Sequence, residues 1–300
     1  MKQDSIIFIS GDQTLEGLSL VEYLYEKKYT NVILESKTTN LVDCFKLNTP
    51  EYVFLLGAIS GGISANIKKP ASLMLSNLTP MIEIINLCLE FKVNKLLYLA
   101  SSCIYPRDAN IDLSPEMIMT GPLEPTNEGY ATTKLTGLKL IKSIRKEYKR
   151  TFISVISANC FGPFDDFDSE DAHVVSSLFR KIKEAKTNKK DLSVWGTGSP
   201  VRDFIFGRDL ASGMVFLMKN YDSDLPINLS SGRGYSIKDL AMKIMDICQF
   251  NGKILFDRTK PDGMPYKVLD NKAISQLGWQ PSISLELSLK LTYDWYLKNY

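Results

Sequence analysis

IIFISGDQTLEG, residues 6–17, is the stretch that decides the fold. Its apolar first part predicts a buried strand, and the pattern over 15–28 predicts an amphipathic helix. Gly11 and Gly17, six residues apart, allow a tight turn and the close approach of a pyrophosphate to the helix amino terminus. Thr14 stands where the usual Gly-x-x-Gly-x-x-Gly pattern has its middle glycine, so the segment alone fits an ordinary strand-to-helix turn equally well.

Outward from this stretch, the first half of the chain alternates short apolar runs with helical patterns. Strands are predicted at 31–34, 52–56, 95–100 and 152–156, with helices at 71–91 and 131–148. Continuous apolar strands separated by helices are typical of a parallel sheet that is covered on both faces. The pattern therefore predicts an α/β fold with a Rossmann-like, doubly wound parallel sheet.

The regular alternation of apolar runs and helical patterns ends after Gly162-Pro163. An Asp-rich loop and a helical pattern over 174–186 precede a strand-like segment at 204–206, which we expect to return to the sheet with a helix at 210–219. A second lobe built from separate segments would cover the edge of the sheet where ligands bind in open α/β folds. We expect a dinucleotide-binding domain over 1–165 plus about 200–232, and a smaller C-terminal α/β substrate lobe over 166–199 and 233–300.

Composition narrows the function classes. Lys and Arg number 36 against 34 Asp and Glu, for a net charge of +2, and no basic stripe stands out, which argues against nucleic acid as a partner. No apolar run approaches the ~18 to 20 residues that span a bilayer, and the first residues lack signal-peptide features. We therefore expect a cytoplasmic protein without membrane association. Five scattered cysteines predict neither a disulfide framework nor a metal site.

A second motif places a phenol, an amine and a hydroxyl at one edge of the predicted sheet. Tyr130 and Lys134 are four residues apart, so both lie on one face of a helix. A phenol with a pKa near ~10 works as an acid or base at neutral pH only beside a stabilising cation. Ser101, at the end of a predicted strand, would hold a substrate carbonyl while Tyr130 supplies the proton. The motif alone also fits a surface helix pair.

Further stretches are specific enough to carry a family resemblance. They are Gly61-Gly62-Ile63, Ser101-Ser102-Cys103-Ile104-Tyr105-Pro106, Leu123-Glu124-Pro125-Thr126-Asn127-Glu128-Gly129-Tyr130, Asn159-Cys160-Phe161-Gly162-Pro163, the Asp-rich loop up to His173-Val174, Val194-Trp195-Gly196-Thr197-Gly198, Lys260-Pro261-Asp262-Gly263, Lys267 and Leu277-Gly278-Trp279. With these stretches the chain resembles, nearly end to end, the extended short-chain dehydrogenase/reductase family. Within that family it is most similar to the GDP-L-fucose synthases, which are epimerase/reductases of GDP-4-keto-6-deoxymannose.

The resemblance implies two sets of catalytic residues. It assigns Ser101, Tyr130 and Lys134 to reduction, and Cys103 with His173 to proton exchange in epimerisation. A thiol and an imidazole suit a reaction that needs a base on one face of a carbon and an acid on the other. His173 is the only histidine in the chain. From the residues alone, Cys103 also fits a buried structural thiol, and His173 a solvated or packing side chain.

For the cofactor, the resemblance implies NADPH. The residues it assigns to this site are Gly11, Gln13, Thr14, Leu15, Lys37, Tyr130, Lys134 and Asn159. Gln13 stands where the family commonly has an Arg near the 2′-phosphate. Glu35 would accept hydrogen bonds from an unphosphorylated ribose and favour NAD, whereas Lys37 would pair with a 2′-phosphate. The residues themselves leave NAD open.

For the substrate, the resemblance implies a GDP-linked keto-sugar. The residues assigned to it are Ser102, Asn159, Lys181, Trp195, Arg202 and Lys267. Basic side chains suit a diphosphate, and Arg202 has the geometry to hold one through two hydrogen bonds. Lys181 replaces an Arg of the family pattern. An Arg-Asp pair such as Arg202-Asp203 also fits a solvated strand edge.

Two further functions stay open beside the epimerase/reductase. One is a dedicated C4-reductase that receives an epimerised substrate such as a GDP-4-keto-heptose. The other is a catalytically silent dinucleotide-binding regulator, which the altered glycine motif favours and the intact Ser101, Tyr130 and Lys134 oppose. A dehydratase is disfavoured because Cys103-Ile104 stands where those relatives have an Asp-Glu pair. The resemblance also implies a homodimer.

Overall fold

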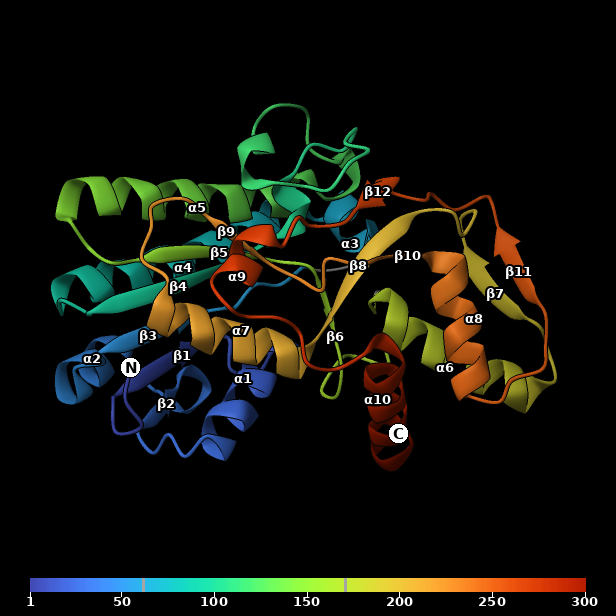
Figure 1. Ribbon diagram of the computed structural model, residues 1–300, viewed down its shortest axis with the longest axis horizontal. Coiled ribbons are helices and arrows are strands. Elements are labelled where there is room, and N and C mark those ends of the chain that lie inside the picture. The colour runs from blue at the N-terminus through green and yellow to red at the C-terminus, as the bar shows by residue number, and fades with distance from the viewer. Residues whose placement is uncertain (61–62, 170–171) are drawn as a thin grey trace.

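A six-stranded sheet, all of whose strands run parallel, forms the centre of the molecule (Figure 1). This computed structural model describes residues 1–60, 63–169 and 172–300, so Gly61-Gly62 and two residues of the Asp-rich loop lie outside it. The strand order is β2-β1-β3-β4-β5-β9, and the bounds are β1 Ile7–Ser10, β2 Val32–Leu34, β3 Tyr52–Leu55, β4 Lys95–Ser101, β5 Ile153–Ser157 and β9 Ile227–Leu229. The prediction of a Rossmann-like α/β fold is confirmed.

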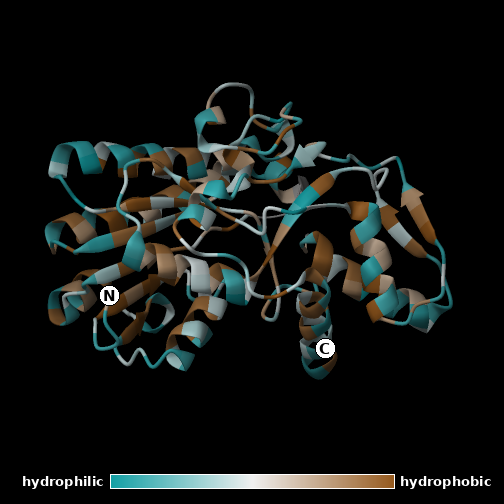
Figure 2. Cartoon of the chain, viewed as in Figure 1, coloured by the Kyte–Doolittle hydropathy of each residue, from teal (hydrophilic) through white to brown (hydrophobic). Residues whose placement is uncertain are grey.

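Helices cover both faces of the sheet. On one face α1 packs against α7, and on the other α4 lies between α2 and α5 (Figure 1). Their bounds are α1 Leu15–Glu26, α2 Leu41–Asn48, α4 Pro70–Glu90, α5 Glu128–Tyr148 and α7 Gly207–Asn220. The central strands are largely hydrophobic and buried because helices cover them on both sides (Figure 2).

The turn after β1 explains the altered glycine motif. Gly11 has φ +76°, and a Cβ there would lie 2.3 Å from the Cα of Gly57, so a side chain is excluded. Thr14 is the N-cap of α1, and its Oγ1 accepts a hydrogen bond from the Gly17 N–H at 3.1 Å. Thr14 therefore replaces the middle glycine without losing the helix start, because a capping hydroxyl satisfies a free N–H of the first turn.

A smaller lobe carries its own core. Its strands are β6 Asn159–Phe161, β7 Leu192–Trp195, β8 Val201–Phe206, β10 Gly234–Ser236, β11 Ile254–Asp257 and β12 Tyr266–Lys267, with helices α6 Val174–Asn188, α8 Ile237–Ile247 and α10 Leu285–Asn299. β8 pairs with β6, β10 and β12, and β7 pairs with β11. Phe161, Phe179 and Tyr296 belong to the lobe's hydrophobic core. The lobe extends away from the sheet (Figure 1).

One predicted strand lies in a different sheet from the one expected. The segment 204–206 is part of β8, which belongs to the lobe and does not return to the central sheet. The helix that follows, α7, does pack on the central body, and the sixth strand is β9. β9 has only three residues, too few to give a strand-like pattern in the sequence.

Asp203 fixes the part of the lobe nearest the sheet. Its fully buried carboxylate accepts hydrogen bonds from the backbone N–H groups of Ser231, Gly232 and Leu269 at 3.2–3.4 Å. Burial raises its pKa to about 6, although these hydrogen bonds oppose the shift. The carboxylate thereby ties β8 to the segment after β9 and to the residues that follow β12.

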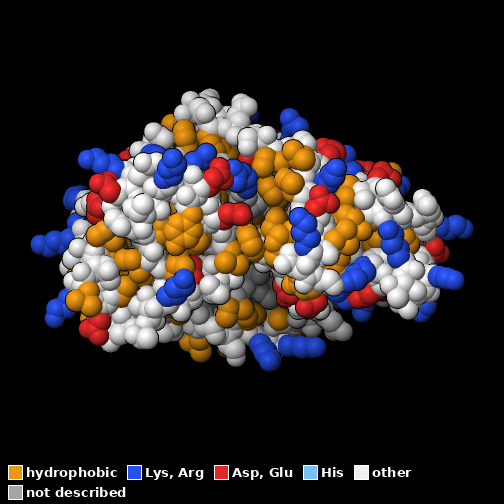
Figure 3. Space-filling view, turned by 90° about the horizontal axis from the view of Figure 1, so that it is seen from below, with side chains coloured by type: hydrophobic (Ala, Val, Ile, Leu, Met, Phe, Trp, Pro, Cys, Tyr) orange, Lys and Arg blue, Asp and Glu red, His pale blue; other side chains and the backbone are white. Residues whose placement is uncertain are grey.

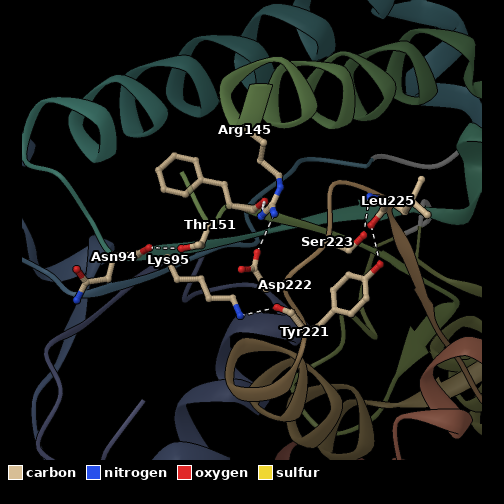
Figure 4. A network of polar contacts seen from close by, with 9 residues as sticks. Asn94, Lys95, Arg145, Thr151, Tyr221, Asp222, Ser223 and Leu225 are labelled. Carbon is tan, nitrogen blue, oxygen red and sulfur yellow. Dashed lines mark hydrogen bonds and ion pairs between the residues drawn. The ribbon is translucent and has the colours of Figure 1, made fainter. Parts of the chain in front are cut away.

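At the opposite edge of the sheet, a polar network joins separate elements (Figure 4). Arg145 of α5 pairs with Asp222 at 2.8 Å, and Lys95 of β4 donates to the carbonyl of Tyr221. These contacts hold the connection from α7 to β9 against the amino ends of the strands. The edge with the carboxyl ends of the strands is the one that faces the lobe.

Helix α4 departs from one expectation. Its 21 residues are long and apolar enough, by length and composition, to cross a membrane, whereas the sequence was expected to contain no such run. A mostly buried core helix passes the same test, whereas 33% of the most apolar window of α4 is buried inside this fold. The remaining connecting helices are short: α3 Ile63–Lys68, α9 Lys272–Gln276, η1 Glu35–Lys37, η2 Ser102–Ile104, η3 Pro115–Met117 and η4 Pro125–Asn127.

Candidate active site

The predicted reduction residues meet at the carboxyl end of β4. Ser101 ends β4, Tyr130 lies in the first turn of α5, and Lys134 follows one turn later. Lys134 is buried, and its Nζ donates to the Leu99 carbonyl at 2.8 Å and lies 5.8 Å from the centre of the Tyr130 ring. The i, i+4 spacing thus places the amine beside the phenol, as the sequence predicts.

Burial decides the protonation of this pair. It raises the pKa of Tyr130 well above its ordinary value, while a hydrogen bond with Ser101 opposes the shift. Burial lowers the pKa of Lys134 to about 8, and the charge of Glu16 acts in the opposite direction. At neutral pH the phenol keeps its proton and the amine is largely charged. The pair can therefore give a proton to a carbonyl oxygen and stabilise the phenolate that results.

Cys103 lies on the short helix η2, next to the same serine. It is 6% exposed, and burial raises the pKa of its thiol. A hydrogen bond with Ser101 and the charges of Lys267 and Lys134 oppose that shift. Ser101 therefore contacts both the phenol and the thiol, and two buried amines are placed to stabilise a thiolate.

His173 immediately precedes α6, at the mouth of the site. Its Nδ1 lies 3.5 Å from Oδ1 of Asp165, and its Nε2 lies 3.4 Å from Oγ of Ser60. The Asp165 carboxylate raises the pKa of the imidazole. The His173 side chain is 54% exposed, whereas that of Asp165 is only 5% exposed. A buried carboxylate thus orients a histidine whose other nitrogen contacts the Ser60 hydroxyl at the mouth of the site.

The cofactor end of the site is rich in carboxylates. Glu35 Oε2 accepts hydrogen bonds from Ser10 Oγ at 2.7 Å and from the Gly11 N–H at 2.9 Å. Asp12 accepts from the Ser36 N–H at 2.9 Å and from Gln13 Nε2 at 3.0 Å. Of the other residues assigned to this end, Leu15 is buried in the core and Lys37 is exposed. The turn therefore offers ribose hydroxyls two acceptors.

The predicted substrate residues fall into two groups. Lys181 Nζ lies 5.2 Å from the Trp195 ring centre, and Arg202 donates to the carbonyl of Asp262 at 3.3 Å. Lys267 of β12 lies opposite Arg202 of β8 in the strand register. Burial lowers the pKa of Lys267 to about 8 and that of Arg202 to about 10. Lys267 therefore lies close enough to affect the pKa of Cys103, and Arg202 and Lys181 lie in the lobe.

Ser102 and Asn159 are held inside the fold. Ser102 is 2% exposed, and the Asn159 side-chain amide donates to the Asp203 carbonyl at 2.8 Å. Across residues 1–60, 63–169 and 172–300, the His, Cys, Asp and Glu side chains form no group of three or more that would hold a metal ion. All five cysteines are free and buried.

Several functional candidates were missed in the sequence. Asp165 orients His173, Glu16 lies close enough to affect the pKa of Tyr130, and Lys260 Nζ lies 5.3 Å from the Trp195 ring centre. The Asp-rich composition around Asp165 and the Pro-Asp-Gly turn after Lys260 were local signals that each residue lies in a loop. Trp195, the partner of Lys260, is remote in sequence, and Asp165 precedes His173 within one loop, for which no spacing rule predicts a contact.

A parallel sheet with a glycine turn at β1 and a Ser-Tyr-Lys group at β4 and α5 defines a dinucleotide-dependent oxidoreductase of the short-chain type. Residues 7–230 match the model of the NAD dependent epimerase/dehydratase family. The chain belongs to this family.

Close relatives and solved structures agree with this assignment. GDP-L-fucose synthase 1 of Arabidopsis thaliana is 39% identical over 301 residues, covering 98% of this chain and 93% of the relative. The crystal structure of a GDP-L-fucose synthetase from Naegleria fowleri bound to NADP has a TM-score of 0.89 at 30% identity, covering 100% of this chain and 95% of that one. A GDP-mannoheptose C4 reductase from Campylobacter jejuni with NADP bound has a TM-score of 0.88 at 29% identity, covering 99% of each chain.

Proposed function

We propose that this protein reduces the C4 ketone of a GDP-linked 4-keto-sugar with NADPH, after 3,5-epimerisation in the same site. The observation that carries the proposal is Ser101, which contacts the Tyr130 phenol and the Cys103 thiol beside the buried Lys134. Ser101 holds the ketone oxygen and Tyr130 gives it a proton, while Lys134 stabilises the phenolate. When bound, the nicotinamide supplies the hydride that the carbonyl carbon accepts.

The turn around Gly11 fits a dinucleotide. A Cβ on Gly11 would contact Gly57 at 2.3 Å, so the two backbone segments meet with no side chain between them. The free N–H groups at the start of α1 suit a pyrophosphate. Gly11, Gln13, Thr14 and Leu15 would hold this part of the cofactor, and Lys37 would be the cation nearest a 2′-phosphate. The NADP-bound relatives support NADPH as the cofactor.

Cys103 and His173 are proposed to exchange the protons of epimerisation. The carbons beside a ketone lose a proton when the resulting enolate oxygen is stabilised, and Ser101 and Tyr130 would contact that oxygen in both steps. The charges of Lys267 and Lys134 partly oppose the burial that raises the pKa of Cys103, the proposed base, and Asp165 favours a protonated His173 as the acid. The same residues would then serve both steps in turn.

The test is NADPH oxidation, followed at 340 nm, with GDP-4-keto-6-deoxymannose as substrate. We expect turnover, with a GDP-linked 6-deoxyhexose that is inverted at C3 and C5 as the product. The GDP-mannoheptose C4 reductase relative supports the second candidate, a dedicated C4-reductase, and GDP-4-keto-heptose is therefore assayed in parallel. If neither sugar leads to NADPH oxidation, both reductase functions are refuted, and the dinucleotide-binding regulator remains.

Assembly and location extend the proposal. Helix α4 exposes Leu75 (65%) and Ile82 (44%), seven residues apart on one face, and only Glu83 and Glu90 among its 21 residues are charged. A second copy packing on this face would make a homodimer, which Ile82→Glu should convert to a monomer in light scattering.

The free, buried cysteines support a location in the cytoplasm, where thiols stay reduced.

The proposed division of labour follows the two hydrophobic cores. Residues 1–165 with about 200–232 would bind the dinucleotide, and 166–199 with 233–300 would bind the nucleotide-sugar. The separate core of the lobe supports this division, although Ile274 and Trp279 pack into the core of the central body. Charges of both signs are interspersed on the face seen in Figure 3, in keeping with a small-molecule partner.

A further inference from the structure

Trp195 is an exposed tryptophan that two lysines contact. It ends β7 and is 48% exposed, with Lys181 Nζ at 5.2 Å and Lys260 Nζ at 5.3 Å from its ring centre. Lys181 comes from α6 and Lys260 from the turn after β11, so three separate segments build the cluster. A tryptophan ring attracts ammonium groups, which limits the freedom of both side chains and brings two like charges together.

The nearby carboxylates accept hydrogen bonds from threonines rather than from the two lysines. Asp262 accepts from the Thr197 N–H at 2.7 Å and from Thr197 Oγ1 at 2.8 Å. Asp257 accepts from the Thr259 N–H at 3.1 Å and from its Oγ1 at 2.6 Å. Within the described parts of the chain, neither lysine forms an ion pair within 4.0 Å, although the charge of Asp257 acts on both. One carboxylate beside two ammonium groups leaves the cluster with excess positive charge.

The turn that carries Lys260 is held against the substrate side of the lobe. Besides the two bonds from Thr197, the carbonyl of Asp262 accepts from Arg202 Nη2 at 3.3 Å. Arg202 is the neighbour of Lys267 across β8 and β12, and the charge of Lys267 reaches Cys103. The cations therefore form a path from the reaction centre to the Trp195 cluster.

We propose that Lys260, acting with Lys181 beside the Trp195 ring, is a diphosphate-binding residue. The inference rests on the proposed function, because it takes the diphosphate to be that of the nucleotide-sugar. Two point charges suit the two negative charges that the diphosphate of a nucleotide-sugar spreads over its four non-bridging oxygens, and the attraction falls with salt. Lys260 would thus select a nucleoside diphosphate over a monophosphate or a nucleoside.

The test measures the binding of GDP, GMP and guanosine by calorimetry in Lys260→Gln, which keeps the length of the chain and removes its charge. We expect the Kd for GDP to rise about tenfold, that for GMP by less, and that for guanosine by under about twofold. The matched control is Lys183→Gln. Lys183 is an exposed lysine of α6, the helix that carries Lys181, and its Nζ lies 5.5 Å from the Tyr296 ring centre. It should bind all three ligands as the wild type does.

The outcomes separate the two proposals. An equal loss of GDP and guanosine affinity in Lys260→Gln would place the base at this cluster and overturn the diphosphate assignment. Unchanged GDP binding in a variant with wild-type thermal unfolding would overturn it as well. A wild-type protein that binds no GDP refutes the proposed function together with this inference, whereas GDP binding without keto-sugar reduction leaves the inference standing.

Discussion

The carboxylate of Glu35 is predicted to weaken the preference for NADPH over NADH. It lies on the phosphate-binding turn, because it accepts from the Gly11 N–H at 2.9 Å. A phosphate monoester carries about −1.5 to −2 charge at pH 7. At a separation of ~7 Å and an effective dielectric constant of ~40, such a group and a carboxylate repel by roughly 2 kcal/mol. Screening by salt at physiological strength reduces this to roughly 1 kcal/mol, or about fivefold in affinity.

Glu35→Gln removes the charge and keeps an oxygen that can accept from Ser10 and Gly11. We expect kcat/KM for NADPH to rise about fivefold, since the repulsion of ~1 kcal/mol is lost. We expect the value for NADH to fall about fivefold, because a neutral acceptor binds a ribose hydroxyl by roughly 1 kcal/mol less than a charged one. The selectivity ratio should change by roughly 25-fold in steady-state assays with both cofactors.

The control is Glu147→Gln, an exposed glutamate in the last turn of α5, near the opposite edge of the sheet. It should leave the ratio within about twofold of the wild type. A ratio in Glu35→Gln that equals the wild-type ratio, in a protein with unchanged thermal unfolding, would show that Glu35 does not face the ribose. The reasoning from the turn geometry would then be wrong.

Three further outcomes are expected. Tyr130→Phe should lower kcat for reduction by ~10² to 10⁴ while NADPH binding, followed by fluorescence, stays within about threefold of the wild type; near-normal turnover would contradict the role of the phenol. Because burial lowers the pKa values of Lys134 and Lys267 to about 8, kcat/KM should decline as pH rises above ~8 and their charge is lost; a flat profile to pH ~9.5 would exclude both. Cys103→Ser should slow deuterium uptake from D₂O at C3 and C5 more than it slows reduction of a pre-epimerised ketone, as NMR and NADPH oxidation would show.

Much of the central body was predictable because its signals are local. The apolar runs that became β1, β3, β4 and β5 are continuous and flanked by helices, and the spacing of Tyr130 and Lys134 places both on one turn of α5. The role of Thr14 follows from its side chain once the helix start is known. The predicted parallel sheet and the placement of Tyr130 and Lys134 on one turn are therefore confirmed.

The lobe and the electrostatics of the site depend on contacts between remote segments. β8 pairs with β6, β10 and β12, and nothing in its own apolar pattern distinguishes these partners from the central sheet. The contact between Lys260 and Trp195 joins a turn to the end of β7, 65 residues away in sequence, and the hydrogen bond from Thr197 to Asp262 spans the same separation. The lowered pKa values of Lys134 and Lys267 come from burial, which only the packed structure supplies.

The Asp165–His173 pair bears on the choice between an epimerase/reductase and a dedicated reductase. Within the described part of the chain, Oδ2 of Asp165 is buried without a hydrogen-bond partner, an arrangement that is unfavourable for stability. A histidine that only shaped the sugar pocket would not need a buried carboxylate to raise its pKa, whereas an acid that protonates a carbanion near neutral pH does. In the proposed reduction, Tyr130 is already the proton donor. The geometry around His173 therefore supports a second proton-transfer step in this site, and deuterium incorporation by the wild-type enzyme is the observation that would separate the two functions.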